Sequence, residues 1–151
     1  MDDAAPLPLS KRRLKTWLRL LRLTRTVEAR LREHLRVDHD TTLPRFDVMA
    51  ALHRRREALS MSELSRLLLV SNGNATAVVD RLEKDGLARR TPSEADRRTV
   101  HVALTPEGVA AFEAMAASHE AMLDELLAGL EPQDMDALRD ILRRALPKEG
   151  E

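Results

Sequence analysis

Apolar residues recur at helical spacing over the first third of the chain. Within residues 10–37 they fall every three or four positions, and Lys and Arg fill most of the positions between them. Pro44 suits the first turn of a second helix, which continues through Phe46, Met49 and Leu52. The pattern therefore predicts a long, basic, amphipathic helix followed by a shorter one.

Two short helices with a tight turn between them are predicted next. Ser60, with a glutamate three residues later, has the form of a capping box and opens a helix through Leu68. Ser71 is the next N-cap, and the helix that it opens ends at Gly86. The short interval between these helices is the length that a helix-turn-helix needs.

The hydrophobic period changes after Gly86. Residues 87–91 and 99–104 predict two short strands, and the polar residues 92–98, which we call the wing, lie between them. A helix capped by Thr105 and a last short helix from residue 132 follow. The predicted fold class is mainly α with a small β-hairpin, a winged helix-turn-helix domain flanked by N- and C-terminal helices. Its predicted boundaries are a disordered tail of residues 1–9, the domain of residues 10–146 and a tail of residues 147–151.

Charge is distributed unevenly, although the net charge of the 151 residues is zero. Residues 1–105 carry 21 Lys and Arg against 14 Asp and Glu, a net charge of +7. Residues 106–151 carry 4 against 11, a net charge of −7. An anionic partner is attracted to the first part and repelled by the second. Two solvated helix surfaces of opposite sign are the alternative explanation.

Composition excludes several classes of protein. The chain has no cysteine, which excludes thiol catalysis, disulfide scaffolds and cysteine zinc clusters. It shows no glycine-rich phosphate loop, nucleophile elbow or zinc-hydrolase helix, so we expect no enzyme activity. One Trp, two Phe and no Tyr argue against proteins that stack single-stranded bases on aromatic rings. Without a long apolar stretch or a secretory signal, we expect a cytoplasmic protein that does not contact membranes.

A helix-turn-helix followed at once by an arginine-bearing hairpin predicts binding to double-stranded DNA. The predicted recognition helix, residues 71–84, starts with small and amide side chains, which suit adenine edges and thymine methyl groups in the major groove. The wing can place arginines on phosphates or in the minor groove. The residues expected to contact DNA are Ser62, Ser65, Arg66, Ser71, Asn72, Gly73, Asn74, Thr76, Ala77, Arg81, Arg89, Arg97 and Arg98.

Two positions in this region have more than one interpretation. Gly73 costs a helix about 1 kcal/mol relative to Ala, so it either lets the backbone approach DNA closely or forms a turn before the helix. In the wing, we expect Arg98 to enter the groove and Asp96 to orient an arginine of the loop. A solvated hairpin tip without DNA contact is the alternative.

The chain resembles the MarR (multiple-antibiotic-resistance regulator) family of transcription factors over about residues 11–146. The recognition helix, with Asp80-Arg81-Leu82-Glu83 and the exit Gly86-Leu87, is similar to that of the family. The wing, with Asp96 and Arg98 running into Leu104-Thr105 and Gly108, resembles the family's Asp-x-Arg wing and Leu-Thr-x-x-Gly sequence. The chain departs from the family in the turn Leu68-Leu69-Val70, where the family often has a glycine.

The resemblance implies a homodimer in which residues 10–37 and 106–146 form the dimerisation helices and residues 44–105 form the DNA-binding lobe. It also implies binding to a pseudo-palindromic operator, usually as a repressor that a small ligand releases. The dimer has separate support, because helices at both ends expose apolar stripes that no sheet can cover.

The family also keeps a ligand cleft where the first, second and fifth helices meet. The residues that would line it here are Trp17, Leu21, Arg22, Arg25, Phe46, Met49, His53, Phe112 and Met115. Apolar residues at this spacing are also typical of a plain core. The sequence Val70-Ser71-Asn72-Gly73-Asn74 looks like the subgroup that senses aryl-coenzyme A thioesters such as hydroxycinnamoyl-CoA. We expect a small aromatic effector, an aromatic acid or such a thioester, and no cofactor. The arginines of the first helix would bind the thioester's phosphates, unless they contact DNA or only keep the helix soluble.

Two other functions are compatible with the sequence. His34, Asp38, His39, Asp40 and His119 could approach a zinc site, as in zinc-responsive members of the family. Their spacing straddles a helix end and no second cluster accompanies them, so no metal is expected. A winged helix used only for protein–protein contact is the other alternative, and the positive charge and the arginines of the wing argue against it.

Overall fold

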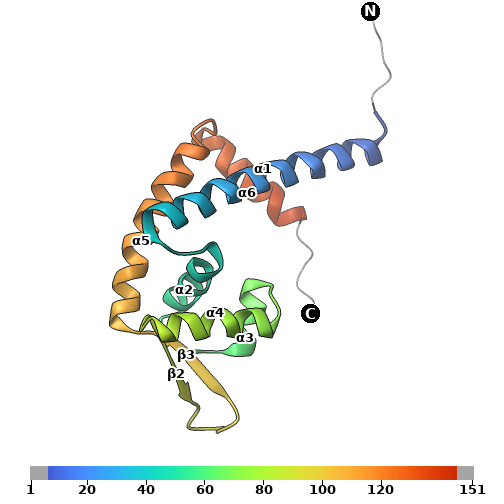
Figure 1. Cartoon of the computed structure of the whole chain (residues 1–151). Helices are drawn as coiled ribbons and strands as arrows, with labels where there is room; N and C mark the ends of the chain where they lie inside the picture. Colours follow the sequence, from blue (N-terminus) through green and yellow to red (C-terminus); the bar gives the residue numbers. More distant parts are fainter. Residues whose placement is uncertain (1–6, 146–151) are drawn as a thin grey trace, which may run out of the picture.

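The computed structural model describes residues 7–145 as a mainly helical protein with a small sheet (Figure 1). This arrangement confirms the predicted fold class. The helix α1 begins one residue before the predicted start, and residues 1–6 and 146–151, which include most of the two predicted tails, lie outside the described residues. The elements in chain order are α1 (Leu9–His39), α2 (Leu43–Arg55), β1 (Leu59–Ser60), α3 (Met61–Leu68), α4 (Asn72–Lys84), β2 (Ala88–Pro92), β3 (Val100–Leu104), α5 (Pro106–Leu126) and α6 (Pro132–Ala145).

Side-chain caps lie at the predicted starts of α3, α4 and α5. At α3 the Ser60 hydroxyl accepts from the backbone N–H of Glu63 at 3.2 Å, and the Glu63 carboxylate accepts from the backbone N–H of Ser60 at 2.8 Å. This backbone hydrogen bond also lowers the pKa of Glu63. Ser71 accepts from the N–H of Asn74 at the start of α4, and Thr105 accepts from the N–H of Gly108 at the start of α5. The predicted caps at these three residues are therefore confirmed.

The sheet is antiparallel and has the strand order β1-β3-β2. The predicted hairpin is present, with Arg90 opposite Val102. The strand β1, in which Leu59 pairs with Val102 across the other edge of β3, was not predicted. A methyl group on Gly108 would lie 1.9 Å from the carbonyl oxygen of Leu87, so the first turn of α5 packs directly on the chain that leaves α4.

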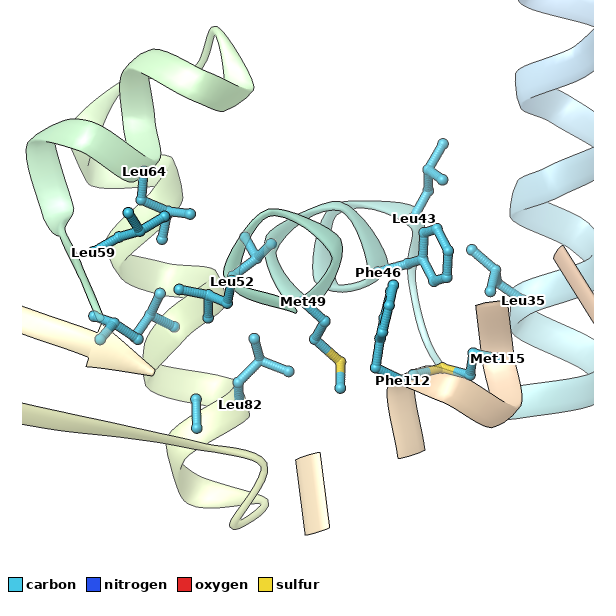
Figure 2. Packing of buried hydrophobic residues seen from close by; sticks show 14 residues of the cluster. Leu35, Leu43, Phe46, Met49, Leu52, Leu59, Leu64, Leu82, Phe112 and Met115 are labelled. Carbon is cyan, nitrogen blue, oxygen red and sulfur yellow. The ribbon is translucent and has the colours of Figure 1, made fainter. Parts of the chain in front are cut away.

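Helix α2 occupies the centre of the hydrophobic core (Figure 2). Its residues Phe46, Met49 and Leu52 are all at least 90% buried. They pack against Leu35 and the α5 residues on one side and against side chains of α3, α4 and the sheet on the other. Burial of each large apolar side chain contributes about 1.5–3 kcal/mol to stability. The packing of α2 therefore stabilises the contact between the helix-turn-helix and the long helices.

A ladder of rings crosses the interface between α2 and α5. His119 stacks on Phe46 with 4.2 Å between ring centroids, Phe46 meets Phe112 at 5.4 Å, and Phe112 meets His53 at 4.7 Å. At the far end, the Nε2 atom of His53 lies 3.3 Å from the Glu113 carboxylate. The two ends of the ladder therefore differ, because His53 has an acidic partner while the Nδ1 atom of His119 is buried without a hydrogen bond from the described residues.

The outer helices bury little of their own surface. The first 22 residues of α1 contain no buried side chain, and Trp17 is 56% exposed. Helix α6 also has no buried residue, although Met135, Ile141 and Leu142 are large apolar side chains. In Figure 1 the N-terminal half of α1 extends past the rest of the molecule. These faces are apolar and without cover in a single chain.

We predict that His119 makes the protein less stable in acid. Burial beside Phe46, and secondarily the nearby His34, lower the pKa of His119. The folded state therefore favours the neutral ring, and the unfolded chain takes up the proton more readily once the pH falls below about 6.5. The free energy of unfolding, measured with urea between pH 8 and pH 5, should decrease as the pH falls from about 6.5 toward the lowered pKa of His119.

A His119→Phe variant should lose part of this dependence on pH while keeping the stack on Phe46. The matched control is His101→Asn, which changes a histidine on β3, away from the ladder. Equal slopes of unfolding free energy against pH in the wild type and in His119→Phe would contradict the assignment to His119.

Candidate nucleic-acid interface

Helix α4 has one buried face and one exposed face. Ala75, Val79 and Leu82 are buried against the core, and the residues predicted to contact DNA on this helix are all exposed. Asn72 and Gly73 are part of the helix, so the alternative that they form a turn before it is wrong. The first turn carries no acidic residue, which leaves the positive end of the helix dipole unopposed.

The turn between α3 and α4 closes without a glycine. Leu69 adopts a left-handed conformation with φ +54° and ends α3, and its N–H donates to the carbonyl of Arg66 at 3.3 Å. This conformation costs a residue other than glycine roughly 1–2 kcal/mol. The Leu69 side chain is 92% exposed, so the position combines backbone strain with an uncovered apolar side chain.

Three predicted DNA contacts lie on α3, and they differ in exposure. Ser62 and Arg66 are exposed. Ser65 is only 5% exposed, and its hydroxyl donates to the carbonyl of Met61 at 2.8 Å. The prediction for Ser65 is wrong because this face of α3 packs onto the core.

Hydrogen bonds within the wing give it a defined shape. The Asp96 carboxylate accepts from the backbone N–H of Arg98 at 2.9 Å and from the hydroxyl of Thr99 at 3.3 Å, and the Ser93 N–H donates to the carbonyl of Thr99 at 2.8 Å. Asp96 therefore orients an arginine of the loop, as expected, and it does so through the backbone of Arg98. Both Arg97 and Arg98 remain exposed.

The arginines around α4 fall into two groups. Arg81 lies 3.7 Å from Asp85, which also binds Arg45 of α2 at 2.5 Å. By contrast, within residues 7–145 no ion pair involves the predicted contacts on β2 and in the wing, namely Arg89, Arg97 and Arg98. These three cations are free to meet an external anion.

Arg90, which the sequence reasoning missed, connects β2 to α4. Its Nη2 atom lies 2.6 Å from the Asp80 carboxylate and its Nη1 atom 2.7 Å from that of Glu83. The two acids are three positions apart on a helix, so they lie on one face. Two acids at this spacing, followed by an arginine on the next strand, are the sequence signal that could have identified the contact.

The nine residues predicted to line a ligand cleft do not come together in a single chain. Phe46, Met49, Phe112 and Met115 are core residues, with His53 beside them at the end of the ring ladder. The other four, on α1, are separate from this group: Leu21, Arg22 and Arg25 line a shallow groove of about 540 Å³ on α1, and Trp17 points to solvent.

A different cavity lies between α1, α2 and the recognition helix. It has a volume of about 430 Å³ and is lined mainly by apolar side chains, including Val48, Val70 and Val78, with Arg32 and Asp47 among its polar groups. Burial raises the pKa of Asp47, and the charge of Arg32 opposes this effect. The volume is within the usual range of small-molecule sites.

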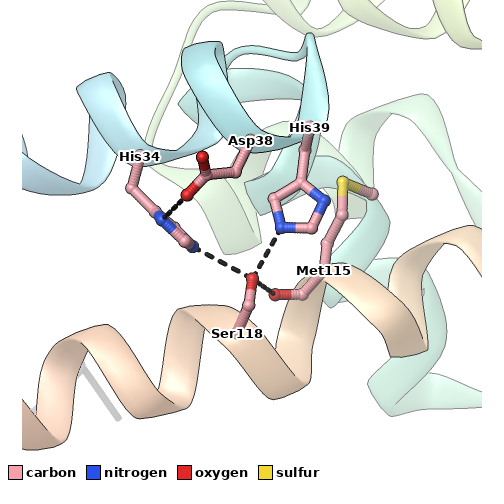
Figure 3. Close-up of polar contacts among 5 residues, drawn as sticks. All are labelled: His34, Asp38, His39, Met115 and Ser118. Atoms are coloured by element: carbon pink, nitrogen blue, oxygen red, sulfur yellow. Dashed lines mark hydrogen bonds and ion pairs between the residues drawn. The ribbon is translucent and has the colours of Figure 1, made fainter.

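His34 and His39, two of the possible zinc ligands in the sequence, take part in a hydrogen-bond cluster (Figure 3). The Nε2 atoms of His34 and His39 lie 3.0 Å and 2.6 Å from the Ser118 hydroxyl oxygen, and His34 Nδ1 lies 2.7 Å from Asp38. His119 stacks on Phe46 instead of joining them. Among residues 7–145, no three His, Asp or Glu side chains are grouped closely enough to hold a metal ion.

Comparisons with known proteins agree on one family. A sequence model described as "MarR family" matches residues 39–99. The regulator PecS of Dickeya dadantii is 36% identical over 66% of this chain, and the chain spans 61% of PecS. The uncharacterized regulator YkoM of Bacillus subtilis is 32% identical over 72% of this chain, which spans 70% of YkoM.

Solved structures extend the similarity to nearly the whole chain. A mutant of MarR from E. coli complexed with operator DNA is 26% identical and has a TM-score of 0.80, covering 93% of this chain and 100% of that one. BpsR of Bordetella bronchiseptica, whose DNA binding is regulated by 6-hydroxynicotinic acid, is 27% identical with a TM-score of 0.76, over 87% and 98% of the two chains.

The fold and the relatives are those of transcriptional regulators, not of enzymes. No helix in residues 7–145 is both long and apolar enough to span a bilayer. Together with the exposed recognition helix and the wing, these similarities show that the chain belongs to the MarR family of winged-helix, DNA-binding transcriptional regulators.

Proposed function

We propose that the protein is a homodimeric repressor that binds a pseudo-palindromic operator through α4 and the wing. The observation that supports this most directly is the exposed, acid-free start of α4 beside wing arginines that have no ion-pair partner among residues 7–145. The amide side chains of α4 would read bases in the major groove, and the wing arginines would bind phosphates or enter the minor groove.

A second copy of the chain would cover the outer helices. Apolar residues of α1 and α6 are exposed together, and the many cations of α1 are complementary to α5, which carries five acidic residues and no Lys or Arg. Residues 10–37 and 106–146 would thus form the dimer, leaving residues 44–105 as the DNA-binding lobe. Twofold pairing would place two recognition helices about 34 Å apart, one turn of DNA.

The first test separates stability from DNA binding at Gly73. Since a methyl group there would meet nothing within 4 Å, Gly73→Ala should stabilise the protein by about 0.5–1 kcal/mol. The same methyl group should weaken binding to an inverted repeat from the protein's own upstream region, because it blocks close approach of the backbone to DNA. Thermal unfolding and fluorescence anisotropy measure the two effects.

Gly129→Ala is the matched control, since this glycine also has free space around it but lies between α5 and α6. It should leave DNA affinity unchanged. A Gly73→Ala variant that gains stability and binds the inverted repeat as tightly as the wild type would refute close approach of α4 to DNA.

The second test concerns the wing. Replacing Arg98 by alanine should weaken binding and reduce the slope of log K against log[salt] by about 0.9, the value for one phosphate contact. Glu94→Ala, which removes an acid from the same loop, should not weaken binding. Absence of any complex with the inverted repeat at low salt would reject the proposed operator binding and leave the protein-interaction module as the better explanation.

We further propose that a small aromatic ligand releases the protein from DNA by binding in the cavity next to α4. Because residues of α4 line this cavity, a ligand there can shift the recognition helix directly. Arg32 suits the carboxylate of an aromatic acid. For an aryl-CoA thioester, the cavity would hold the aryl group, and the CoA phosphates would lie outside it along the basic residues near the start of α1, namely Lys11, Arg12, Arg13, Arg19 and Arg22.

Titration of the protein–DNA complex with 4-hydroxycinnamate, 4-hydroxycinnamoyl-CoA and free CoA tests the effector class. We expect release by the acid or the thioester and none by free CoA, with Arg32→Ala needing at least about tenfold more ligand. Arg36→Ala, which removes an exposed arginine paired with Glu33, is the control. Release that is the same in wild type and Arg32→Ala would exclude this cavity, and no release by any of the three compounds would exclude the aryl class.

A further inference from the structure

The side chain of Arg90 joins the recognition helix to the strand that leads into the wing. Its two terminal nitrogens bind separate carboxylates, those of Asp80 and Glu83, at 2.6 Å and 2.7 Å. Nη2 also lies 3.5 Å from the backbone carbonyl oxygen of Thr76, one turn earlier in α4. One planar group therefore holds α4 at several points along its length, a geometry that a lysine could not reproduce.

The arginine in this contact is less exposed than in an ordinary surface ion pair. The Arg90 side chain is 24% exposed, while those of Asp80 and Glu83 are 60% and 39% exposed. Exposed pairs contribute little because two long side chains lose entropy to meet. Here strand pairing with Val102 of β3 fixes the backbone of Arg90, and one side chain reaches two carboxylates.

The position of Arg90 allows this contact to influence how the wing is placed relative to α4. Pro92, two residues further along β2, begins the wing, and the turn at Gly86 is the covalent link between α4 and β2. The base of the hairpin is fixed by the pairing of β3 with β1 and by the buried side chains of Ala88 and Val102. Arg90 lies two residues beyond Ala88, toward the wing, and there it fixes β2 to the side of α4.

We propose that Arg90 is a positioning residue for operator recognition, which fixes the angle between the wing and α4 so that both enter their grooves together. The inference rests on the proposed contact between the wing and DNA. Arg90 touches α4 and not the DNA. Its effect on affinity is therefore transmitted through the wing arginines, of which Arg98 is the one to test.

The experiment is a double-mutant cycle of Arg90→Met and Arg98→Ala, with operator affinity measured over a range of salt concentrations. Arg90→Met keeps the length of the side chain and removes its charge and hydrogen bonds. In the wild-type background Arg98→Ala should weaken binding. In the Arg90→Met background, where the wing is no longer held, the same change should have an effect smaller by about five- to tenfold.

Two further variants distinguish positioning from its alternatives. Arg89→Met changes the neighbouring exposed arginine and should add to Arg98→Ala independently. Asp80→Asn with Glu83→Gln, added to Arg90→Met, removes the uncompensated acids without restoring the link. Affinity should stay low in this triple variant. Recovery of affinity would show that Arg90 only neutralises acids near the DNA, and would overturn the proposal.

Other outcomes are equally decisive when measured below the unfolding temperature of each variant. Full additivity of Arg90→Met and Arg98→Ala, with a salt slope lowered by about 0.9 for Arg90→Met alone, would make Arg90 a direct phosphate contact. Wild-type affinity in Arg90→Met would overturn the inference and leave the proposed function intact. No effect of Arg98→Ala in the wild-type background would overturn the wing contact and this inference together.

Discussion

The burial of α2 between the long helices and the helix-turn-helix is the interaction on which the rest of the structure depends. Phe46 and Met49 face α5, while Leu52 faces α4 and the sheet, so this one helix belongs to both parts of the molecule. A change in the orientation of α2 must move α4 relative to α1 and α5, because close-packed side chains transmit displacement. The proposed effector cavity, which α1, α2 and α4 line together, is thus well placed to affect the spacing of two recognition helices.

Ion pairs determine where the net positive charge lies on the side that is proposed to face DNA. Helix α4 and its C-cap carry Asp80, Glu83 and Asp85, which would repel phosphates if they were left alone. Each acid has an arginine partner. Arg90 of β2 pairs with Asp80 and Glu83, and Arg45 of α2 pairs with Asp85. The cations of the wing have no such partner among residues 7–145, and so the net positive charge of this region is concentrated where an external polyanion can reach it.

The sequence predicted those features that depend on local chemistry. The N-caps at Ser60, Ser71 and Thr105 and the hairpin follow from hydrogen bonds or alternation within a few residues, and all are present. The strand β1 was missed because two residues carry no periodic signal. The burial of Ser65 was missed because it depends on which face of α3 the core covers. The ligand cleft could not be located from apolar spacing, which is the same for a core residue and a cavity wall.

The same distinction between local and long-range information applies to α1 and α6. Both were easy to predict as helices, but their apolar faces are not covered in one chain. Their amphipathic patterns specify a face to be buried but not what buries it. In the described residues that face stays exposed, even though α1 alone is 31 residues long. Leaving so much apolar surface in water is unfavourable by about 25 cal/mol for each Å². A copy of the chain supplies both an apolar face and, through the acids of α5, charges opposite to those of α1. Dimerisation and the spacing of the DNA-binding lobes would then have a single physical origin.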